Sequence, residues 1–271
     1  MLNLYWADDS GLPANDRGLA YGDGLFETIR MQGDRGLLLT RHLRRLARDA
    51  KRLGIDVEPE ELKVACNRAV GRWPHSSDQG WVLKLTLTRG AGGRGYRPDD
   101  HMTPNLLVSR ASLPPAPDPE GVTADFSRVP LTVAPLFAGI KSLNRLDQVM
   151  AARELTDQLF EVIMSNSNGD LVEGTRTNLL LKTRECWVTP PAASLAVAGI
   201  LREWLLERLR ERGDLVTERP LTVADVTGAD CQGLFLLNSV LGIVPVRRLA
   251  DQDLPVDSGL ATIFHPHDLL E

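Results

Sequence analysis

The sequence feature that most restricts the fold is a proline-rich segment at residues 113–121, which contains four prolines. Proline fixes φ and lacks a backbone N–H, so such a segment disfavours a helix or a central strand and is typical of a semi-rigid linker. It divides the chain of 271 residues into two parts. We therefore expect two domains, a smaller one at residues 1–112 and a larger one at residues 122–271.

The N-terminal part mixes strand and helix patterns. Residues 25–31 alternate between apolar and polar side chains, which predicts a strand. Residues 40–53 place apolar side chains at helical spacing, and we expect Thr40 to cap this helix and Gly54 to end it. The other elements expected here are a helix that begins at Pro59 and runs to residue 72, and strands at residues 81–88 and 105–109.

The C-terminal part shows the same mixture without a regular βαβ rhythm, so the pattern favours an α+β fold with a mostly β core in the larger domain. We expect a helix at residues 145–158 capped by Asn144, and a second helix at residues 200–212 ended by Gly213. Asn168-Gly169 predicts a tight hairpin turn. Strands are expected at residues 161–164, 179–181, 187–189, 234–237 and 243–246.

Composition excludes several classes of protein. The formal net charge is −5 and the pI is near 5.6, which argues against a general nucleic-acid binder. Three cysteines, far apart and odd in number, argue against a disulfide framework and a CxxC metal site. The first residues lack the basic and apolar regions of a signal peptide, and no apolar run is long enough to span a bilayer. The expectation is a cytoplasmic protein without membrane segments.

One motif is rejected as a dinucleotide site and another as a metal site. Residues 90–95 satisfy the GxGxxG pattern after an expected strand, but the following residues 96–104 are hostile to the helix that a dinucleotide site requires. This segment is either a flexible hairpin tip or a glycine loop that presents Arg94 and Arg97 to a carboxylate. His265 and His267 have no third ligand group at a suitable spacing, so we expect no metal site.

Lys141 and Glu173 together indicate a specific chemistry. A lysine can form a Schiff base with pyridoxal 5'-phosphate, while a carboxylate can keep the pyridine nitrogen of this cofactor protonated. The charged ring then accepts electrons from the carbon that bears the substrate amine. Neither residue is diagnostic alone, because most lysines and glutamates are solvated surface charges.

Three further segments supply groups that suit a phosphate. An arginine within residues 42–46 has the planar fork that pairs with phosphate oxygens. Gly199 and Ile200 open an expected helix, whose free backbone N–H groups and positive dipole end attract anions. Ser239 follows an expected buried strand and adds a hydroxyl. The simple alternative is that the basic residues of 42–46 are solvated while the leucines between them face the core.

These segments carry a resemblance to a known family. The chain resembles the fold-type IV pyridoxal-phosphate enzymes, which include branched-chain and D-amino-acid transaminases and the aminodeoxychorismate lyases. The resemblance covers nearly the whole chain, and residues 86–96 and 139–146 are most similar to the lyases. The segments that occur in the family's order are residues 21–28, 42–46, 138–146, 173–179, 199–200 and 238–239.

Carried over position by position, the resemblance implies a set of cofactor-binding residues. Lys141 matches the Schiff-base lysine, Glu173 the carboxylate at the pyridine nitrogen, and Arg45 the phosphate-binding arginine. The remaining members are Ile200 and Leu201, whose backbone matches the phosphate cup, Ser239, whose hydroxyl matches a phosphate ligand, and Asn178, within the motif that begins at Glu173.

The chain departs from the transaminase pattern at three positions. Leu201 stands where transaminases have threonine, so one side-chain hydrogen bond to phosphate is lost. Arg145 stands where an aromatic residue is usual, and no role is assigned to it. Thr28 stands where branched-chain transaminases have glycine, and the lyase resemblance associates its hydroxyl with proton transfer.

The function implied is conversion of 4-amino-4-deoxychorismate to 4-aminobenzoate and pyruvate, a step of folate synthesis. Lys141 removes the C4 proton of the cofactor-bound substrate, enolpyruvate is eliminated, and aromatisation drives the reaction. Arg94, Arg97 and Asn238 are candidates for binding the substrate carboxylates. The alternatives are a D-amino-acid or branched-chain aminotransferase of the same fold, and a nucleotide-binding or non-catalytic module. The resemblance also implies a homodimer, with the active site in the cleft between domains.

Overall fold

The computed structural model describes residues 2–9, 11–73, 80–257, 259–262 and 269–271. The chain forms two compact units. The first unit comprises Met1–Leu113 with Lys141–Asn144 and Leu269–Glu271, and the second comprises Pro114–Ile140 and Arg145–Asp268. These units are defined by contacts, so the domain limits expected at residues 112 and 122 remain a prediction. His265 and His267 lie outside the described residues.

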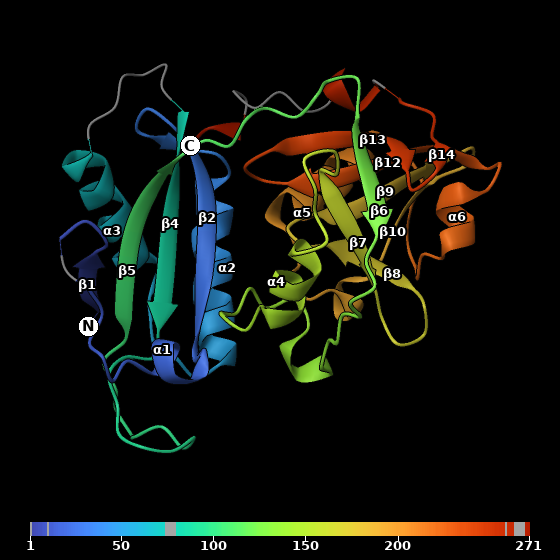
Figure 1. The fold of residues 1–271 in the computed structure, drawn as a ribbon. Helices are drawn as coiled ribbons and strands as arrows, with labels where there is room; N and C mark the ends of the chain where they lie inside the picture. The colour runs from blue at the N-terminus through green and yellow to red at the C-terminus, as the bar shows by residue number, and fades with distance from the viewer. Residues whose placement is uncertain (1, 10, 74–79, 258, 263–268) are drawn as a thin grey trace. The chain divides into compact units, whose positions relative to one another are not determined.

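The first unit is built on a five-stranded sheet in the order β1-β5-β4-β2-β3. Helices α2 and α3 pack together on one face of this sheet (Figure 1). The strands expected at residues 25–31, 81–88 and 105–109 and the helix expected at 59–72 are all confirmed. The strands are β1 (Asn3–Trp6), β2 (Gly24–Gln32), β3 (Arg35–Gly36), β4 (Gly80–Thr88) and β5 (Asn105–Ser112), and the helices are α1 (Arg17–Tyr21), α2 (Leu39–Arg52) and α3 (Pro59–Arg72).

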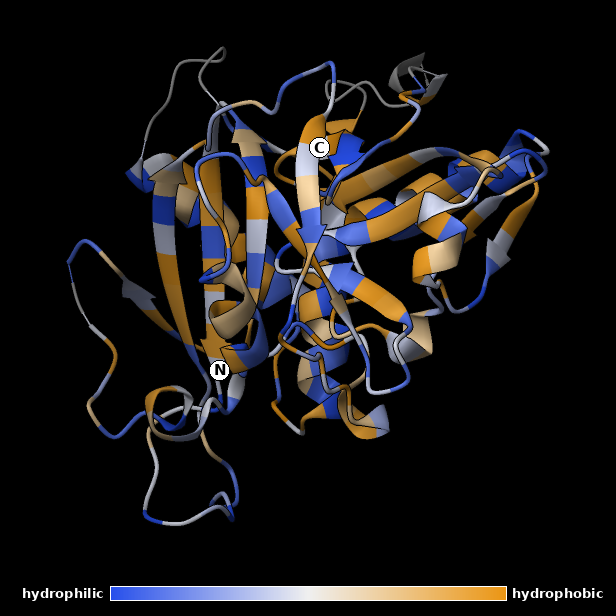
Figure 2. Ribbon diagram, turned by 45° about the vertical axis from the view of Figure 1, so that its right-hand side comes forward, coloured by the Kyte–Doolittle hydropathy of each residue, from blue (hydrophilic) through white to orange (hydrophobic). Residues whose placement is uncertain are grey.

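Strand β2 has one buried and one half-buried face. Leu25, Ile29 and Met31 are almost completely buried, while Phe26 and Thr28 lie on the alternate, half-buried positions. This difference follows from the period of two along a strand, which sends successive side chains to opposite faces. Figure 2 shows the corresponding bands of apolar and polar residues on the strands. The half-buried face of β2 is therefore able to present side chains to a ligand.

The start of α2 differs from the expectation that Thr40 caps it. The helix begins at Leu39 after Leu38, which has a positive φ of 52° and makes no side-chain cap. Thr40 lies inside the helix, and its backbone N–H donates to Glu271 Oε2 at 2.7 Å. A carboxylate 231 residues away therefore satisfies the first turn. The sequence around Thr40 contains no sign of it.

A short segment of the chain that follows the linker extends the first sheet. Lys141 accepts a hydrogen bond through its carbonyl from the N–H of Phe26 at 3.0 Å, and the N–H of Leu143 donates to Gly24 at 3.0 Å. Asn144 Nδ2 donates to the carbonyl of Gly22 at 3.0 Å. Asn144 is thus not the helix cap that was expected, because its side chain anchors this segment instead.

The second unit is a closed ring of strands. β9, β12, β13, β6, β7 and β8 pair in turn, and β8 pairs again with β9. Closure leaves these strands without an open edge. The elements are β6 (Val122–Phe126), β7 (Glu161–Ser165), β8 (Leu171–Gly174), β9 (Asn178–Thr183), β10 (Trp187–Thr189), β11 (Val216–Glu218), β12 (Cys231–Asn238), β13 (Gly242–Leu249), β14 (Gln252–Asp253), α4 (Leu146–Ala152), α5 (Ile200–Glu211), α6 (Val223–Thr227), and the 3-10 helices η1 (Pro135–Phe137), η2 (Ala192–Ser194) and η3 (Gly259–Thr262).

Two apolar clusters pack this unit, and they use alternate residues of the same strands. On β7, Ile163 belongs to the larger cluster, whereas Val162 and Met164 belong to a smaller cluster that includes Ala151 of α4. The larger cluster also contains Leu171, Leu179, Leu181, Leu234, Leu236, Val244 and Val246. The expected strands of this part, the Asn168-Gly169 hairpin and the helix that ends before Gly213 are confirmed.

Helix α4 is shorter than the expected span of residues 145–158. It ends at Ala152, and the following residues form turns, with the N–H of Leu159 donating to the carbonyl of Thr156 at 3.1 Å. The hydroxyl of Thr156 also accepts from the N–H of Gln158 at 3.4 Å. Such local bonds offer the backbone an alternative to the helix. Among the described residues, no helix combines the length and apolarity that crossing a bilayer would require.

Candidate active-site residues

Lys141 lies beside the half-buried face of β2. Its Nζ is 4.3 Å from the centroid of the Phe26 ring, an arrangement in which the aromatic face attracts the cation. Lys84 of β4 approaches the same ring, with its Nζ at 5.4 Å. Thr28 is two residues beyond Phe26 on the same strand and pairs in register with Lys84. Lysine, threonine and a second cation are therefore gathered on one face of the first unit.

The opposite face of β2 holds a buried charge cluster. The carboxylate of Glu27 accepts from Arg45 Nε at 2.7 Å through Oε1, and from Arg45 Nη2 at 2.7 Å through Oε2. His42 Nδ1 donates to the same Oε2 at 2.6 Å. All three side chains are at least nine-tenths buried. Glu27 thus fixes the plane of the guanidinium that was expected to bind phosphate, and that role of Arg45 remains a prediction.

The cluster shifts the ionisation of its members. Burial raises the pKa of Glu27, but the charges and hydrogen bonds of Arg45 and His42 outweigh it and lower this pKa from 4.5 to about 2. Burial also lowers the pKa of His42, and the charges of Arg45 and Lys141 add to that lowering against the opposing effect of Glu27. His42 Nε2 has no hydrogen-bond partner among the described residues. Arg45 is therefore the counter-ion of Glu27 near neutral pH.

Glu173 lies where the ring of the second unit closes. It pairs in register with Asn178 across β8 and β9. Glu173 Oε2 accepts from the N–H of Val197 at 3.1 Å, and Asn178 Nδ2 donates to the carbonyl of Val197 at 2.9 Å. Both predicted cofactor residues are therefore held against one residue of the segment that leads into α5. Glu173 is only 4% exposed, which suits a carboxylate that must face a buried cation.

A second carboxylate supports the turn that joins β8 to β9. Glu161 is completely buried, and it accepts from the N–H and hydroxyl of Thr175 at 3.0 and 2.6 Å. It also accepts from the N–H of Arg176 at 3.3 Å and the hydroxyl of Thr177 at 3.0 Å. A Cβ at Gly174 would lie 2.6 Å from Cδ of Glu161, so only glycine fits above this carboxylate.

The beginning of α5 fits the expected phosphate cup. Gly199 is its N-cap residue, and no side chain caps the helix. The first-turn N–H groups, which include those of Ile200 and Leu201, therefore retain the donor capacity that an anion uses. A Cβ at Gly199 would overlap Oδ1 of Asn178. Arg202 anchors the first turn through hydrogen bonds to Thr189, Pro190 and Glu218.

The turn between β12 and β13 carries two predicted residues. Asn238 Nδ2 donates to the carbonyl of Arg176 at 2.8 Å, and its Oδ1 accepts from the N–H groups of Val240 and Leu241 at 2.8 and 3.3 Å. The side chain of Asn238 thus organises the turn, and its role in substrate binding remains a prediction. Ser239 is half-buried in the same turn.

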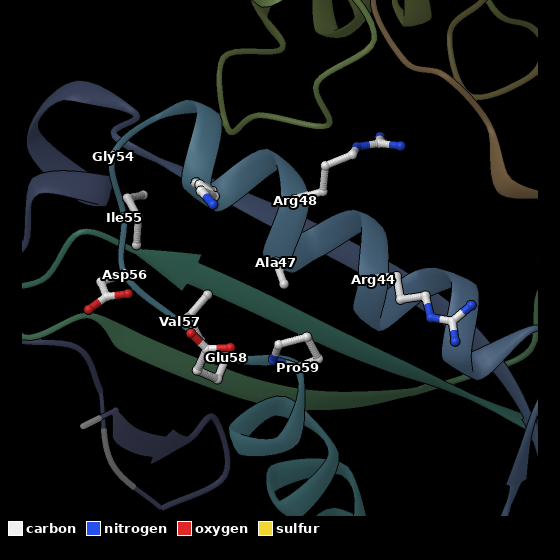
Figure 3. Close-up of a pocket in the computed structure, with 10 residues that line it drawn as sticks. Arg44, Ala47, Arg48, Gly54, Ile55, Asp56, Val57, Glu58 and Pro59 are labelled. Atoms are coloured by element: carbon white, nitrogen blue, oxygen red, sulfur yellow. The ribbon is translucent and has the colours of Figure 1, made fainter.

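A cavity of about 520 Å³ in the first unit does not contain the predicted site residues. It lies between α2 and the segment that follows it, and Figure 3 shows Arg44 and Arg48 extending from the helix. Its lining comprises Arg44, Ala47, Arg48, Lys51, Gly54, Ile55, Asp56, Val57, Glu58 and Pro59. The lysine and the glutamate of this lining, Lys51 and Glu58, are not the predicted cofactor residues Lys141 and Glu173.

Three residues with contacts at the site were not found from the sequence: Glu27, Lys84 and Glu161. A signal existed for Glu27, because it occupies a buried position in the alternating pattern of residues 25–31. Lys84 occupies an ordinary exposed position of its strand, and its meaning comes from the pairing of β4 with Thr28. Glu161 is the first residue of a mostly apolar strand, and nothing local distinguishes it from a surface acid.

Comparison with known proteins adds to this geometry. The family model of class IV amino-transferases matches residues 24–249. The crystal structure of 4-amino-4-deoxychorismate lyase from Pseudomonas aeruginosa aligns with a TM-score of 0.85 and 36% identity, covering 96% of this chain and 93% of that one. The aminodeoxychorismate lyase of Vibrio harveyi is 30% identical over 94% of each chain. The D-alanine aminotransferase of Bacillus licheniformis is 29% identical, covering 88% of this chain and 83% of its own.

The residues present fit pyridoxal 5'-phosphate. A buried carboxylate suits the pyridine nitrogen, an uncapped helix start suits the phosphate, and a half-buried lysine amine suits the aldehyde. The predictions of an α+β fold, of a cofactor-dependent enzyme and of pyridoxal 5'-phosphate as the cofactor are confirmed through the family. With most of its length matched by the family model, this chain belongs to the class IV aminotransferase family of pyridoxal-phosphate enzymes.

Proposed function

We propose that this protein is a lyase that converts 4-amino-4-deoxychorismate to 4-aminobenzoate and pyruvate. The observation that carries the proposal is the similarity to two lyases, at 36% and 30% identity, over more than nine-tenths of each chain. The hydroxyl of Thr28 on the face that also holds Lys141 supports it, because this reaction needs a base and a proton relay. When bound, the cofactor supplies an electron sink for the carbon that bears the substrate amine.

The predicted site residues of the first unit have separate roles in the proposed reaction. Lys141 accepts the proton from C4 of the substrate through its Nζ. The C3–oxygen bond of the substrate breaks, and the hydroxyl of Thr28 passes a proton to the methylene carbon or the oxygen of the departing enolpyruvate and regains one from the protonated Nζ of Lys141. Lys84, exposed beside Thr28, is a candidate for binding a substrate carboxylate, together with Arg94 and Arg97. Placing cations at the carboxylates orients the ring so that C4 faces the base.

In this proposal the cofactor has four predicted ligand groups besides Lys141, and one positioning residue. Glu173 accepts a hydrogen bond from the pyridinium N–H and keeps the ring cationic. The amides of Ile200 and Leu201, the hydroxyl of Ser239 and the guanidinium of Arg45 bind the phosphate. Asn178 keeps Glu173 and the start of α5 in register through Val197.

We also propose a homodimer whose interface includes an apolar patch of the second unit. The patch, formed by η1 and α4, exposes several large hydrophobic side chains within fifteen residues of sequence. Large apolar side chains that are exposed to solvent in this number are typical of protein–protein contacts. Its members are Leu136 (73% exposed), Phe137 (50%), Leu146 (77%), Val149 (55%) and Met150 (47%).

The lyase proposal is tested by a product assay. Purified holoenzyme is given 4-amino-4-deoxychorismate, and pyruvate and 4-aminobenzoate are measured. In parallel, D-alanine and 2-oxoglutarate are supplied, and amino transfer is measured. Equal amounts of both products without amino transfer support the proposal. Transfer alone establishes the second candidate, an aminotransferase, which the similarity to the D-alanine aminotransferase favours.

The assignment of Lys141 has its own test. Borohydride reduction of the holoenzyme followed by mass spectrometry of peptides is expected to find the cofactor on Lys141. The Lys141→Ala protein is expected to bind cofactor without becoming reducible at that peptide. A reduced adduct on another lysine would refute the assignment.

A further inference from the structure

The glycine loop, defined as residues 90–104, is held in place by the first helix of the chain. The sequence leaves open whether this segment is a flexible tip or a loop that presents arginines. In the structure no helix follows the glycines, and Arg94, Tyr96 and Arg97 are exposed at the tip. Neither Arg94 nor Arg97 has a hydrogen bond or ion pair within the described part of the chain. What holds the loop is a buried side chain, Arg17.

The guanidinium of Arg17 bridges the loop tip and a carboxylate. Nη1 donates to the carbonyl of Gly95 at 2.9 Å, and Nη2 donates to the carbonyl of Tyr96 at 2.7 Å. Nε donates to Asp23 Oδ2 at 2.8 Å. Arg17 is 4% exposed, while Gly95 and Tyr96 are exposed, so the bonds between them are partly buried. The planar guanidinium of Arg17 thereby donates to two consecutive carbonyls at the loop tip.

Tyr21, one turn later on α1, adds a second attachment. Its hydroxyl accepts from the N–H of Gly95 at 3.1 Å, and its ring lies 5.5 Å from the ring of Tyr96. The guanidinium of Arg17 lies 4.8 Å above the ring of Tyr21. The helix, the guanidinium and the loop tip are therefore joined by a continuous set of contacts.

The glycines of the loop make room for this clamp. A Cβ at Gly92 would lie 3.1 Å from Cδ of Arg17 and 2.8 Å from Cε of Met102. Gly90 has a φ of +110°, and a Cβ there would overlap the carbonyl oxygen of Thr103. The base of the loop is fixed as well, since the N–H of Arg17 donates to the carbonyl of Gly90 at 3.0 Å.

We propose that Arg17 is a positioning residue for substrate recognition. It holds the Gly95–Tyr96 backbone, so that the loop carrying Arg94 and Arg97 is ordered before an anionic substrate binds. The inference rests on the proposed function, in which this loop binds a carboxylate. A loop ordered before binding spares the entropy cost of ordering it on the substrate, so the clamp acts on substrate affinity. Arg17 does not touch the reacting atoms, and the chemical step is expected to proceed without it.

Limited trypsin digestion with mass spectrometry measures the clamp without using activity. Arg17→Gln removes the donors to Gly95 and Tyr96, and cleavage after Arg94 is expected to accelerate about tenfold, because bonds to a charged donor are lost. Arg97 gives no tryptic cleavage, because Pro98 follows it. Arg89→Gln is the matched control, since Arg89 shares Asp23 but otherwise donates to Leu53 and Gly54. In this control the cleavage rate is expected to stay within about twofold of wild type.

Steady-state kinetics on holoenzyme test the functional half. For Arg17→Gln the KM for 4-amino-4-deoxychorismate is expected to rise about tenfold while kcat changes less than about twofold. Tyr21→Phe, a milder variant that folds with one hydroxyl fewer, is expected to raise cleavage and KM together by about twofold to threefold. If the wild type proves to be an aminotransferase, the proposed function fails, and the same comparison is made with the KM for D-alanine.

Specific outcomes overturn the inference. Digestion of Arg17→Gln at the wild-type rate would show that Arg17 does not hold the loop. Faster cleavage with an unchanged KM would show that the loop is not used for substrate. Cleavage spread over the whole chain would identify general unfolding, and the Tyr21→Phe protein then decides: parallel changes in loop cleavage and KM support the clamp, and their absence overturns it.

Discussion

Two buried carboxylates, one in each unit, are stabilised in opposite ways. Glu27 is matched by a cation, the guanidinium of Arg45, with His42 as an additional donor. Within the described part of the chain, Glu161 receives hydrogen bonds only from neutral groups: two backbone N–H groups and two hydroxyls from the turn at residues 175–177, and the N–H of Val162 at 3.1 Å. The Nε of Arg176 lies 4.0 Å from Oε2 of Glu161, beyond hydrogen-bond distance. The exposed fractions of the two are 1% and 0%, so burial does not distinguish them. The chemical nature of their hydrogen-bond donors distinguishes the two carboxylates.

The difference shows what each carboxylate organises. The ion pair fixes the orientation of a side chain, Arg45, and makes each partner depend on the charge of the other. The neutral donors around Glu161 fix a backbone turn instead, and Glu173 and Asn178 stand at the two ends of that turn. The first unit therefore positions a guanidinium and the second unit positions a pair of strand ends.

The largest effect is expected from Glu27→Gln. This change leaves the guanidinium of Arg45 buried without a counter-ion, and it should cost about 3–5 kcal/mol in the free energy of unfolding. Urea unfolding of the cofactor-free protein at neutral pH measures this cost, because the cofactor phosphate would itself be an anion for Arg45. Adding Arg45→Met to Glu27→Gln removes the unmatched charge and is expected to recover part of the loss. If the double variant were less stable than the sum of the single effects, the ion-pair description of Glu27 would be wrong.

Acid is expected to reduce the contribution of Glu27 to the free energy of unfolding of the wild type. The folded pKa is about 2, below the ordinary 4.5, because Arg45 and His42 outweigh the effect of burial. Since the folded pKa is the lower one, the carboxylate contributes its stability above pH 4.5 and loses it as the pH falls toward 2. The whole shift corresponds to about 3 kcal/mol.

Urea unfolding of wild type and Glu27→Gln in steps across this pH window measures the effect. The difference between their free energies of unfolding should narrow toward the acid end. A difference that stayed constant across the window would mean that Glu27 is not ionised in the folded protein.

Glu161→Gln is expected to cost less, about 1–3 kcal/mol, because the donors around it are neutral and the amide oxygen still accepts one or two of them. The turn should loosen, and with it Glu173, so cofactor affinity should fall and the absorption spectrum of the bound cofactor should change. Asp225→Asn is the control for loss of a hydrogen-bonded carboxylate elsewhere in the second unit: Asp225 accepts from the N–H and hydroxyl of Thr222 at the start of α6 and also pairs with Arg219 at 2.8 Å. An equal spectral change in this control would remove the special role of Glu161.

The sequence predicts the parts of this comparison that depend on local pattern. The period of residues 25–31, the Pro59 start and the Gly213 end of helices, and the Asn168-Gly169 hairpin are set by neighbouring residues and are confirmed. The start of α2 is not local, because Glu271 completes it from the other end of the chain. Asn144 likewise has the composition of a cap, but its partner is Gly22.

The same distinction between local and distant determinants applies to the candidate site. Lys141 and Glu173 can be singled out because their chemistry is specific to a cofactor, and the phosphate-binding helix start is visible as Gly199 before an amphipathic run. Glu161 and Lys84 cannot be singled out, since their importance comes from strand pairing and from a turn that packs over a carboxylate. Residues that touch a ligand are thus more visible in sequence than those that hold them.

The smallest effect expected is that of a single neutral donor. Thr175→Val removes the hydroxyl that reaches Glu161 at 2.6 Å but keeps the backbone N–H at 3.0 Å, and it should cost about 1 kcal/mol. Arg45→Met, which strips Glu27 of its cation, should cost several times more. Urea unfolding of both proteins under one set of conditions gives the ratio. Were the two losses equal, one neutral hydroxyl would stabilise its carboxylate as strongly as a guanidinium that makes two hydrogen bonds, and the charge of the donor would not distinguish the two units.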